Sequence, residues 1–196
     1  MREKKPSAGR GRKRSVKRLL TTAALLILLL VAWKSLAFYG FAPDVPRSDK
    51  RVVSLHPDVR AAADRLVRQA ADRGIDIAIT SGFRSGEEQD RLYRQGRQDA
   101  GNIVTNARGG QSYHNYGLAI DFALRDGSDI VWDMERDGNG NGRSDWMEVV
   151  ELAKALGFDW GGDWENFPDY PHLQMDFGHT LRQLRHGKFP KGSVTE

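Results

Sequence analysis

The stretch Ser112-Tyr113-His114-Asn115-Tyr116-Gly117-Leu118-Ala119-Ile120-Asp121 is the part of the sequence around which the fold is organised. In its second half apolar residues alternate with small or acidic ones, as in a strand with one buried face. We therefore predict a strand over residues 118–124 that holds the Asp121 carboxylate away from the apolar face. His114 lies in the loop before this strand, where Gly117 is expected to leave room beside it.

A second histidine lies far downstream, at the start of a predicted strand over residues 172–177. The alternation assigns His172, Gln174 and Asp176 to the site and Leu173, Met175 and Phe177 to the core. Two imidazoles and one carboxylate suit zinc, and three protein ligands leave the fourth position open, as in catalytic rather than structural zinc sites. The sequence therefore predicts a zinc site formed by His114, Asp121 and His172.

The remaining patterned segments indicate a mixture of helices and strands. Apolar residues at three- and four-residue spacing predict helices, alternation predicts a strand, and Ser85 with Glu88 forms a capping box at a helix start. The predicted elements are helices over 57–73, 85–94 and 146–156, a strand over 75–80 and a loop over 96–111. Because there is no regular βαβ alternation, the expected fold class is α+β, with a small antiparallel sheet flanked by helices in a domain over residues 51–190.

Two charged residues outside the ligand set are candidates for catalysis. Asp169 lies three residues before His172 in a turn next to a proline, where a carboxylate can accept a proton from water and pass it to a leaving amine. Arg84 follows the end of a predicted strand, where a guanidinium can steady a substrate carbonyl or an oxyanion. The alternatives are a turn-forming aspartate and a surface salt bridge, both of which are common.

Residues 137–148 match the pattern of a twelve-residue calcium loop, with glycine at position 6 and a helix after it. The candidate ligands are Asp137, Asn139, Asn141, Arg143 through its backbone carbonyl, Asp145 and Glu148. Two features depart from the pattern: Ser144 stands at position 8, and residues 130–132 before the loop suggest a strand instead of a helix. The alternative is a solvated turn rich in glycine and asparagine, and the neutral asparagines predict a weak calcium site.

Charge is concentrated at the N-terminus of the 196-residue chain. Residues 1–34 contain ten Lys and Arg and one acidic residue, although the whole chain has a formal net charge of only +4. A basic tail can bind nucleic acid, but an apolar segment follows this one directly, so we expect a role in membrane topology and no nucleic-acid partner. The absence of cysteine excludes disulfides, cysteine nucleophiles and thiolate metal ligands.

Residues 19–41 are largely apolar, with Lys34 as the sole charge, and as a helix would extend roughly 34 Å, which is enough to cross a bilayer. We expect residues 1–18 to be a disordered cytoplasmic tail, 19–41 a single transmembrane anchor and 42–50 a linker. The positive charge before the anchor places the domain outside the cytoplasmic membrane, in a bacterial periplasm or extracellular space. The alternative is a signal peptide cleaved near Ser35-Leu36-Ala37, which would export the domain as well.

Three ordered motifs together resemble a known family of zinc peptidases. They are the opening stretch, Asp169-x-Pro171-His172-x-Gln174, and Ser81-Gly82-Phe83-Arg84-Ser85, and the resemblance spans about residues 52–178. The family includes L-alanyl-D-glutamate endopeptidases and D-Ala-D-Ala carboxypeptidases. The resemblance implies the hedgehog-type α+β fold, three zinc ligands, Asp169 as general base and Arg84 as transition-state stabiliser. We also expect Ser112 and Gln174 to bind substrate.

The resemblance implies a peptidase that acts on the stem peptides of peptidoglycan. Pro-His-Leu-Gln with an aspartate base is similar to the L-alanyl-D-glutamate branch, although Leu173 stands where that branch usually has an aromatic residue. One alternative is a D-Ala-D-Ala carboxypeptidase. Another is a non-catalytic zinc and calcium domain that binds cell wall or a partner protein, against which the presence of both Asp169 and Arg84 argues.

Overall fold

The computed structural model of the chain describes residues 50–196. The expected tail over 1–18, the membrane segment over 19–41 and all but the last residue of the linker lie outside the described residues. None of the helices between residues 50 and 196 combines the length and the apolar character needed to cross a membrane.

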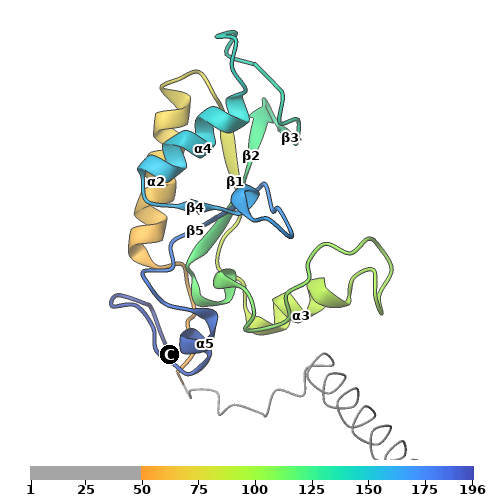
Figure 1. Cartoon of the computed structure of the whole chain (residues 1–196), viewed down its shortest axis with the longest axis vertical. Helices are drawn as coiled ribbons and strands as arrows, with labels where there is room; N and C mark the ends of the chain where they lie inside the picture. Colours follow the sequence, from red (N-terminus) through yellow and green to blue (C-terminus); the bar gives the residue numbers. More distant parts are fainter. Residues whose placement is uncertain (1–49) are drawn as a thin grey trace, which may run out of the picture. The chain divides into compact units, whose positions relative to one another are not determined.

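One five-stranded sheet forms the centre of the domain (Figure 1). Its strands are β1 (Ile77–Ser81), β2 (Ala119–Asp126), β3 (Asp129–Val131), β4 (Asp159–Trp160) and β5 (His172–Gln174). The order is β1-β2-β5-β4, β3 pairs with β2, and every pairing is antiparallel. This confirms the expected α+β class with a small antiparallel sheet.

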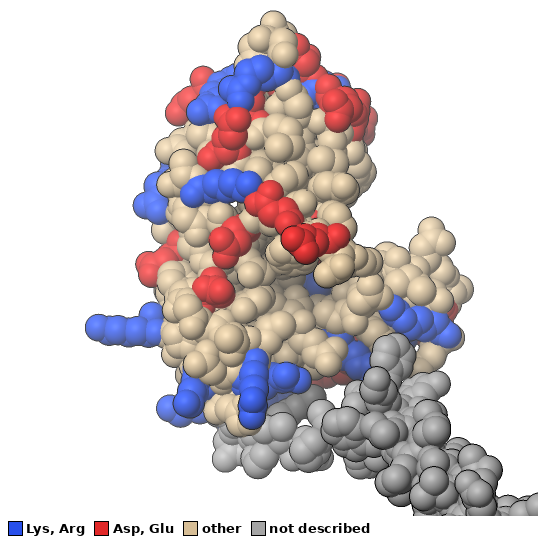
Figure 2. Space-filling view, viewed as in Figure 1, with Lys and Arg blue, Asp and Glu red and all other residues tan. Residues whose placement is uncertain are grey.

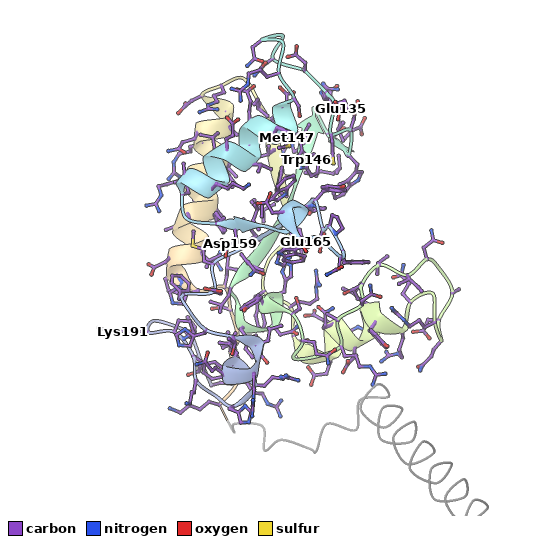
Figure 3. All side chains as sticks on the ribbon, in the orientation of Figure 1. Glu135, Trp146, Met147, Asp159, Glu165 and Lys191 are labelled. Atoms are coloured by element: carbon purple, nitrogen blue, oxygen red, sulfur yellow. The ribbon has the colours of Figure 1, made fainter. Side chains whose placement is uncertain are left out.

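Helices α2 (Pro57–Ala71) and α4 (Asp145–Ala155) pack against the sheet and against each other. Helix α2 begins after His56, whose side chain accepts a hydrogen bond from the backbone N–H of Asp58. From α4, the buried Trp146 packs on Phe122 of β2 with ring centroids 4.6 Å apart (Figure 3). Burying side chains of this size contributes about 1.5–3 kcal/mol each. The layer between these two helices and the sheet contains most of the core.

Helix α3 (Gly86–Arg94) and the loop after it form an arm, residues 86–110, that projects from the body of the domain (Figure 1). The predicted capping box is present, since the Ser85 hydroxyl accepts from the Glu88 N–H and the Glu88 carboxylate accepts from the Ser85 N–H. Shorter helical turns complete the domain, namely η1 (Tyr113–Tyr116), η2 (Gly161–Asp163) and α5 (Leu181–Arg185).

The predicted strand over 172–177 is wrong in its second half, because β5 ends at Gln174. The chain then turns: the Gly178 N–H donates to the Asp176 carboxylate, and Phe177 has a left-handed φ of 50°. The Phe177 side chain is 41% exposed and its ring lies 4.8 Å from that of His56, so it does not join the central core. Asp176 therefore caps a turn instead of facing the site.

Candidate active site

Three separate elements bring together the side chains of the predicted zinc site. His114 comes from η1, Asp121 from β2 and His172 from β5. Asp121 and His172 are directly opposite each other in the antiparallel β2–β5 pair. Segment 81–85 is tied to η1, since the Arg84 N–H donates to the His114 carbonyl at 3.1 Å. Backbone hydrogen bonds thus hold all three side chains at one position on the sheet.

The ligand atoms of these side chains are close enough to share one metal ion. His114 Nε2 lies 3.2 Å from Asp121 Oδ1 and 3.2 Å from His172 Nδ1, and His172 Nδ1 lies 3.6 Å from Asp121 Oδ1. In a tetrahedral zinc site with bonds of about 2.0–2.1 Å, neighbouring ligand atoms are about 3.3 Å apart. The donor set and its spacing therefore fit zinc with one position left open.

Each imidazole is fixed by a second hydrogen bond on its far side. His114 donates through Nδ1 to the Gly82 carbonyl at 2.7 Å, and His172 donates through Nε2 to the Gln174 side-chain oxygen at 3.0 Å. Because these oxygens are acceptors, each ring in its neutral form turns its unprotonated nitrogen toward the centre of the site. Gln174 is buried and supports His172, and its expected contact with substrate stays a prediction.

The second oxygen of Asp121 faces Arg84. Burial would raise the pKa of the Asp121 carboxyl, but the hydrogen bonds and charges of the His114 and His172 imidazoles, when these are protonated, outweigh it and lower the pKa well below its usual range. Arg84 Nη2 lies 3.5 Å from Asp121 Oδ2, and the guanidinium also donates to Ser81 at 2.8 Å and to Gln89 at 2.9 Å. Asp121 is thus ionised, and Arg84 is held in one orientation beside it.

Asp169 lies next to the same cluster, as predicted. Burial and the nearby Asp121 charge raise the pKa of the Asp169 carboxyl, although the surrounding His172, His114 and Arg84 charges oppose the shift. Within residues 50–196 this carboxylate makes no hydrogen bond, so it is available to a substrate or to water. Its backbone is held by Gly161, whose carbonyl accepts from the Asp169 N–H at 3.0 Å.

Two positions near the site require glycine because of close contacts that the sequence did not reveal. Gly117 does not serve to leave room beside His114: it has φ 66°, and a Cβ there would lie 2.2 Å from the Ser54 carbonyl oxygen. Glycine is needed because the backbone of residues 54–56 passes against it. At Gly161 a Cβ would lie 2.5 Å from the Asp169 carbonyl oxygen.

Ser112 caps η1, because its hydroxyl accepts a hydrogen bond from the His114 N–H at 3.3 Å. Its expected contact with substrate stays a prediction.

The surface is hollowed between the body of the domain and the α3 arm (Figure 2). A groove of about 440 Å³ runs between the end of β1 and α3, and Arg84, Glu88 and Arg91 are among its lining residues. Across the site, the ring of Trp164 lies 5.1 Å from that of His172. Trp164 was not identified as a site residue from the sequence. An aromatic residue in a non-periodic segment shortly before His172 could have indicated it.

The 137–148 loop is held in a turn by hydrogen bonds to its own side chains. The Asp137 carboxylate accepts from the N–H groups of Asn141 and Gly142 at 3.0 and 2.9 Å. The side-chain amides of Asn139 and Asn141 donate to Glu148 at 3.1 and 2.7 Å. The preceding strand β3 confirms that no entering helix is present.

The carboxylate oxygens of this loop do not come as close to one another as the ligand atoms of the candidate zinc site. Among the described residues, only His114, Asp121 and His172 bring three ligand atoms of acidic, histidine or cysteine side chains within 4.8 Å of one another. Glu148 also lies 3.5 Å from Arg73 and 3.6 Å from Arg143. Asp145 is 3% exposed, and its Oδ1 has no hydrogen-bond partner in the described part of the chain.

Comparison with known proteins places the chain among peptidoglycan peptidases. A family model described as D-alanyl-D-alanine carboxypeptidase matches residues 105–175. The peptidoglycan L-alanyl-D-glutamate endopeptidase CwlK of Bacillus subtilis (strain 168) is 69% identical over 123 residues, which cover 62% of this chain and 73% of that protein.

Two further similarities are more distant. The L-alanyl-D-glutamate peptidase of Listeria phage A118 is 34% identical over 132 residues, covering 67% of this chain and 41% of that protein. The solved structure of the L-Ala D-Glu endopeptidase ChiX of Serratia marcescens has 22% identity and a TM-score of 0.44, covering 67% of this chain and 85% of that one.

Proposed function

This chain belongs to the family of zinc peptidases that includes L-alanyl-D-glutamate endopeptidases and D-alanyl-D-alanine carboxypeptidases, and from that premise we propose that it hydrolyses the L-alanyl-D-glutamate bond of peptidoglycan stem peptides. The observation that carries the proposal is the convergence of three zinc-type ligand atoms with Asp169 beside them. The choice of bond is supported by the relatives, two of which are described as L-alanyl-D-glutamate peptidases.

We assign the zinc ligands as His114 Nε2, Asp121 Oδ1 and His172 Nδ1. Zinc bound there supplies a Lewis acid that polarises the scissile carbonyl and makes water more acidic. Gly82 and Gln174 keep the two imidazoles in the tautomer that presents a lone pair to the metal.

Asp169 is assigned as the general base. The oxygen of water adds to the scissile carbonyl carbon, its proton goes to Asp169, and Asp169 passes that proton to the departing amine nitrogen as the C–N bond breaks. The raised pKa of Asp169 suits this role, because a carboxylate of higher basicity accepts the proton more readily. Arg84 is assigned to the negative charge on the carbonyl oxygen, with Ser81 and Gln89 holding its guanidinium.

Digestion of purified muropeptides followed by mass spectrometry tests the function directly. Loss of the whole stem peptide after L-alanine is the expected result. Loss of a single terminal D-alanine would support the alternative, a D-alanyl-D-alanine carboxypeptidase, which the description of the matching family model favours. The absence of any hydrolysis by zinc-loaded protein would favour a non-catalytic cell-wall or partner-binding domain.

We further propose that residues 19–41 anchor the protein in the bacterial cytoplasmic membrane, with the N-terminus in the cytoplasm and the peptidase domain outside. The support is the apolar length of this segment and the basic residues before it. Carbonate washing of membranes, with N-terminal sequencing of the protein that remains bound, tests this. Release by carbonate, or a new N-terminus after Ala37, would replace the anchor with a cleaved signal peptide.

A weak calcium site in the 137–148 loop is also proposed. Its support is the turn that Asp137 stabilises and the buried Asp145 oxygen, since a buried acceptor without a partner is costly unless a cation or water satisfies it. Millimolar calcium should raise the melting temperature of the wild type but not that of Asp137→Asn. Asp129→Asn, an exposed acid outside the loop, is the control, and equal shifts in all three proteins would contradict the site.

A further inference from the structure

Residues 164–171, here called the aromatic loop, lead directly to His172 and expose three large aromatic side chains. Trp164 is 38% exposed, Phe167 55% and Tyr170 43%. Isolated exposed aromatics are ordinary, but several on one short segment at an active site indicate a binding surface. The same segment carries Asp169, so whatever these rings bind lies close to the scissile bond.

The inner side of this loop is fixed to the body of the domain. The Trp164 N–H donates to the Gly161 carbonyl at 3.3 Å, and the Tyr170 carbonyl accepts from Trp160 Nε1 at 2.7 Å. The Trp164 ring packs near His172 at 5.1 Å, and the Tyr170 ring lies 6.0 Å from that of Trp160. The rings of Trp164 and Tyr170 are therefore held in place before a ligand arrives, which reduces the entropy lost on binding.

The two sides of the site differ in charge. The groove toward α3 is lined by the guanidinium groups of Arg84 and Arg91 and by one carboxylate, that of Glu88, so the cationic groups are in excess there. The aromatic loop carries the acidic Glu165, which is labelled in Figure 3. Its sequence also contains Asp169 and no Lys or Arg. An anionic group is attracted to the first side and repelled by the second.

The substrate of the proposed reaction has a matching asymmetry. Beyond D-glutamate the stem peptide carries free carboxylates, including the α-carboxylate of the glutamate, because the chain continues through its side chain. On the other side L-alanine is joined directly to the lactyl group of N-acetylmuramic acid, whose carboxyl is consumed in that amide. One end is therefore anionic, whereas the other is an uncharged sugar whose C–H faces suit the electron-rich face of an aromatic ring.

We propose that the aromatic loop is a sugar subsite, in which Trp164, Phe167 and Tyr170 bind the N-acetylmuramyl residue next to the scissile bond. The stem peptide then runs toward the groove that contains Arg84 and Arg91. This inference rests on the proposed endopeptidase function and adds to it an orientation for the substrate and a preference for stem peptides that are still attached to glycan.

Two substrates with the same stem peptide test the subsite. One carries the natural disaccharide on L-alanine, and the other carries an acetyl group, which preserves the amide and its neutral charge. We expect the wild-type protein to have about tenfold higher kcat/KM for the disaccharide substrate, a difference of about 1.4 kcal/mol. Phe167→Ala should remove most of this preference through KM, while kcat on the acetylated peptide changes by less than about twofold.

Trp132→Ala is the matched control, because Trp132 is 56% exposed but lies outside the aromatic loop. It should leave the ratio between the two substrates unchanged. Equal wild-type rates on both substrates would overturn the sugar subsite, while cleavage of the acetylated peptide would still support the endopeptidase function. A Phe167→Ala variant that slows both substrates alike would also overturn it.

A binding measurement separates the subsite from catalysis. Saturation-transfer NMR with the disaccharide carrying L-alanine amide should show transfer from the wild-type protein to the sugar-ring protons, and a weaker transfer from Phe167→Ala. If the protein hydrolyses neither substrate but this transfer is present, the endopeptidase function fails and the sugar subsite stands. If the transfer is absent, the subsite fails irrespective of the hydrolysis result.

Discussion

His114, Asp121 and His172 come from three separate elements, whereas the candidate ligands of the 137–148 loop come from one continuous segment. The first group is held by strand pairing and by hydrogen bonds behind each imidazole, so its ligand atoms already lie at metal-binding distances. In the loop, backbone N–H groups and side-chain amides donate hydrogen bonds to the carboxylates. A site assembled by the fold is thus pre-organised without its metal, whereas a local one uses its ligands to stabilise its own turn.

The largest effect should come from removing a zinc ligand. His172→Ala is expected to lower kcat/KM by about 10⁴-fold or more, since a catalytic metal supplies several kcal/mol of transition-state stabilisation. Zinc content measured by mass spectrometry should fall with activity, while the calcium-dependent shift in melting temperature should persist. If the variant loses the calcium response as well, the two sites are not independent and the contrast between them fails.

Asp169→Asn should lower kcat by about a thousandfold while zinc stays bound, because the amide keeps the shape of the side chain but cannot accept the proton. Zinc content and the rate of hydrolysis, measured on the same preparation, distinguish this result from loss of the metal. Cleavage at the wild-type rate would show that Asp169 is not the base.

An intermediate effect is expected from changing Gln174, which supports one of the proposed zinc ligands. Gln174→Met removes the acceptor of the His172 Nε2–H, and the loss of such an outer hydrogen bond typically weakens metal affinity by about 10–100-fold. Competition with a zinc chelator measures this. Activity should recover in excess zinc, and an unchanged zinc affinity would mean that strand pairing alone orients His172.

The smallest effect concerns the 137–148 loop and its dependence on pH. Burial would raise the pKa of Glu148, but hydrogen bonds from Asn141 and Asn139 and the charges of Arg143 and Arg73 outweigh it and lower the pKa. A carboxyl whose pKa is lower in the folded state adds stability above its unfolded pKa and loses it as the pH falls through the folded value.

The melting temperature of the calcium-free wild type should therefore decline as the pH falls from about 5 toward 3, through the range below the ordinary carboxyl pKa. Glu148→Gln should decline less steeply, while Asp129→Asn, an exposed acid outside the loop, should follow the wild type. Parallel curves for all three proteins would show that Glu148 does not stabilise the folded loop.

Local pattern was sufficient for much of the fold. Alternation predicted β2, and the spacing of apolar residues and the Ser85 capping box predicted α2, α4 and α3 nearly to their ends. The convergence of His114, Asp121 and His172 was also predictable, because His114 and Asp121 share one motif and His172 begins the strand that pairs with it. The error at residues 175–177 arose because alternation continues through a turn that Asp176 and Gly178 form.

Contacts that depend on how non-periodic segments pack in three dimensions were not predictable. The need for glycine at position 117 comes from the Ser54 carbonyl, and the position of Trp164 becomes clear only when its loop returns to His172. Arg84 was expected from its motif, but its hydrogen bonds to Ser81 and Gln89 depend on how α3 leaves the sheet. These features arise from packing between segments and leave no periodic signal in one sequence.

The pairing of β2 with β5 also determines when the protein becomes active. His114 and His172 are 58 residues apart in the chain, and the 137–148 loop, α4 and β4 must fold between them. Closing so long a connection is entropically costly and slow compared with forming a helix, so the histidines meet only when nearly the whole domain has folded. A growing or partly unfolded chain therefore lacks the complete cluster of His114, Asp121 and His172, so a reaction that depends on this cluster would begin only once the domain has folded.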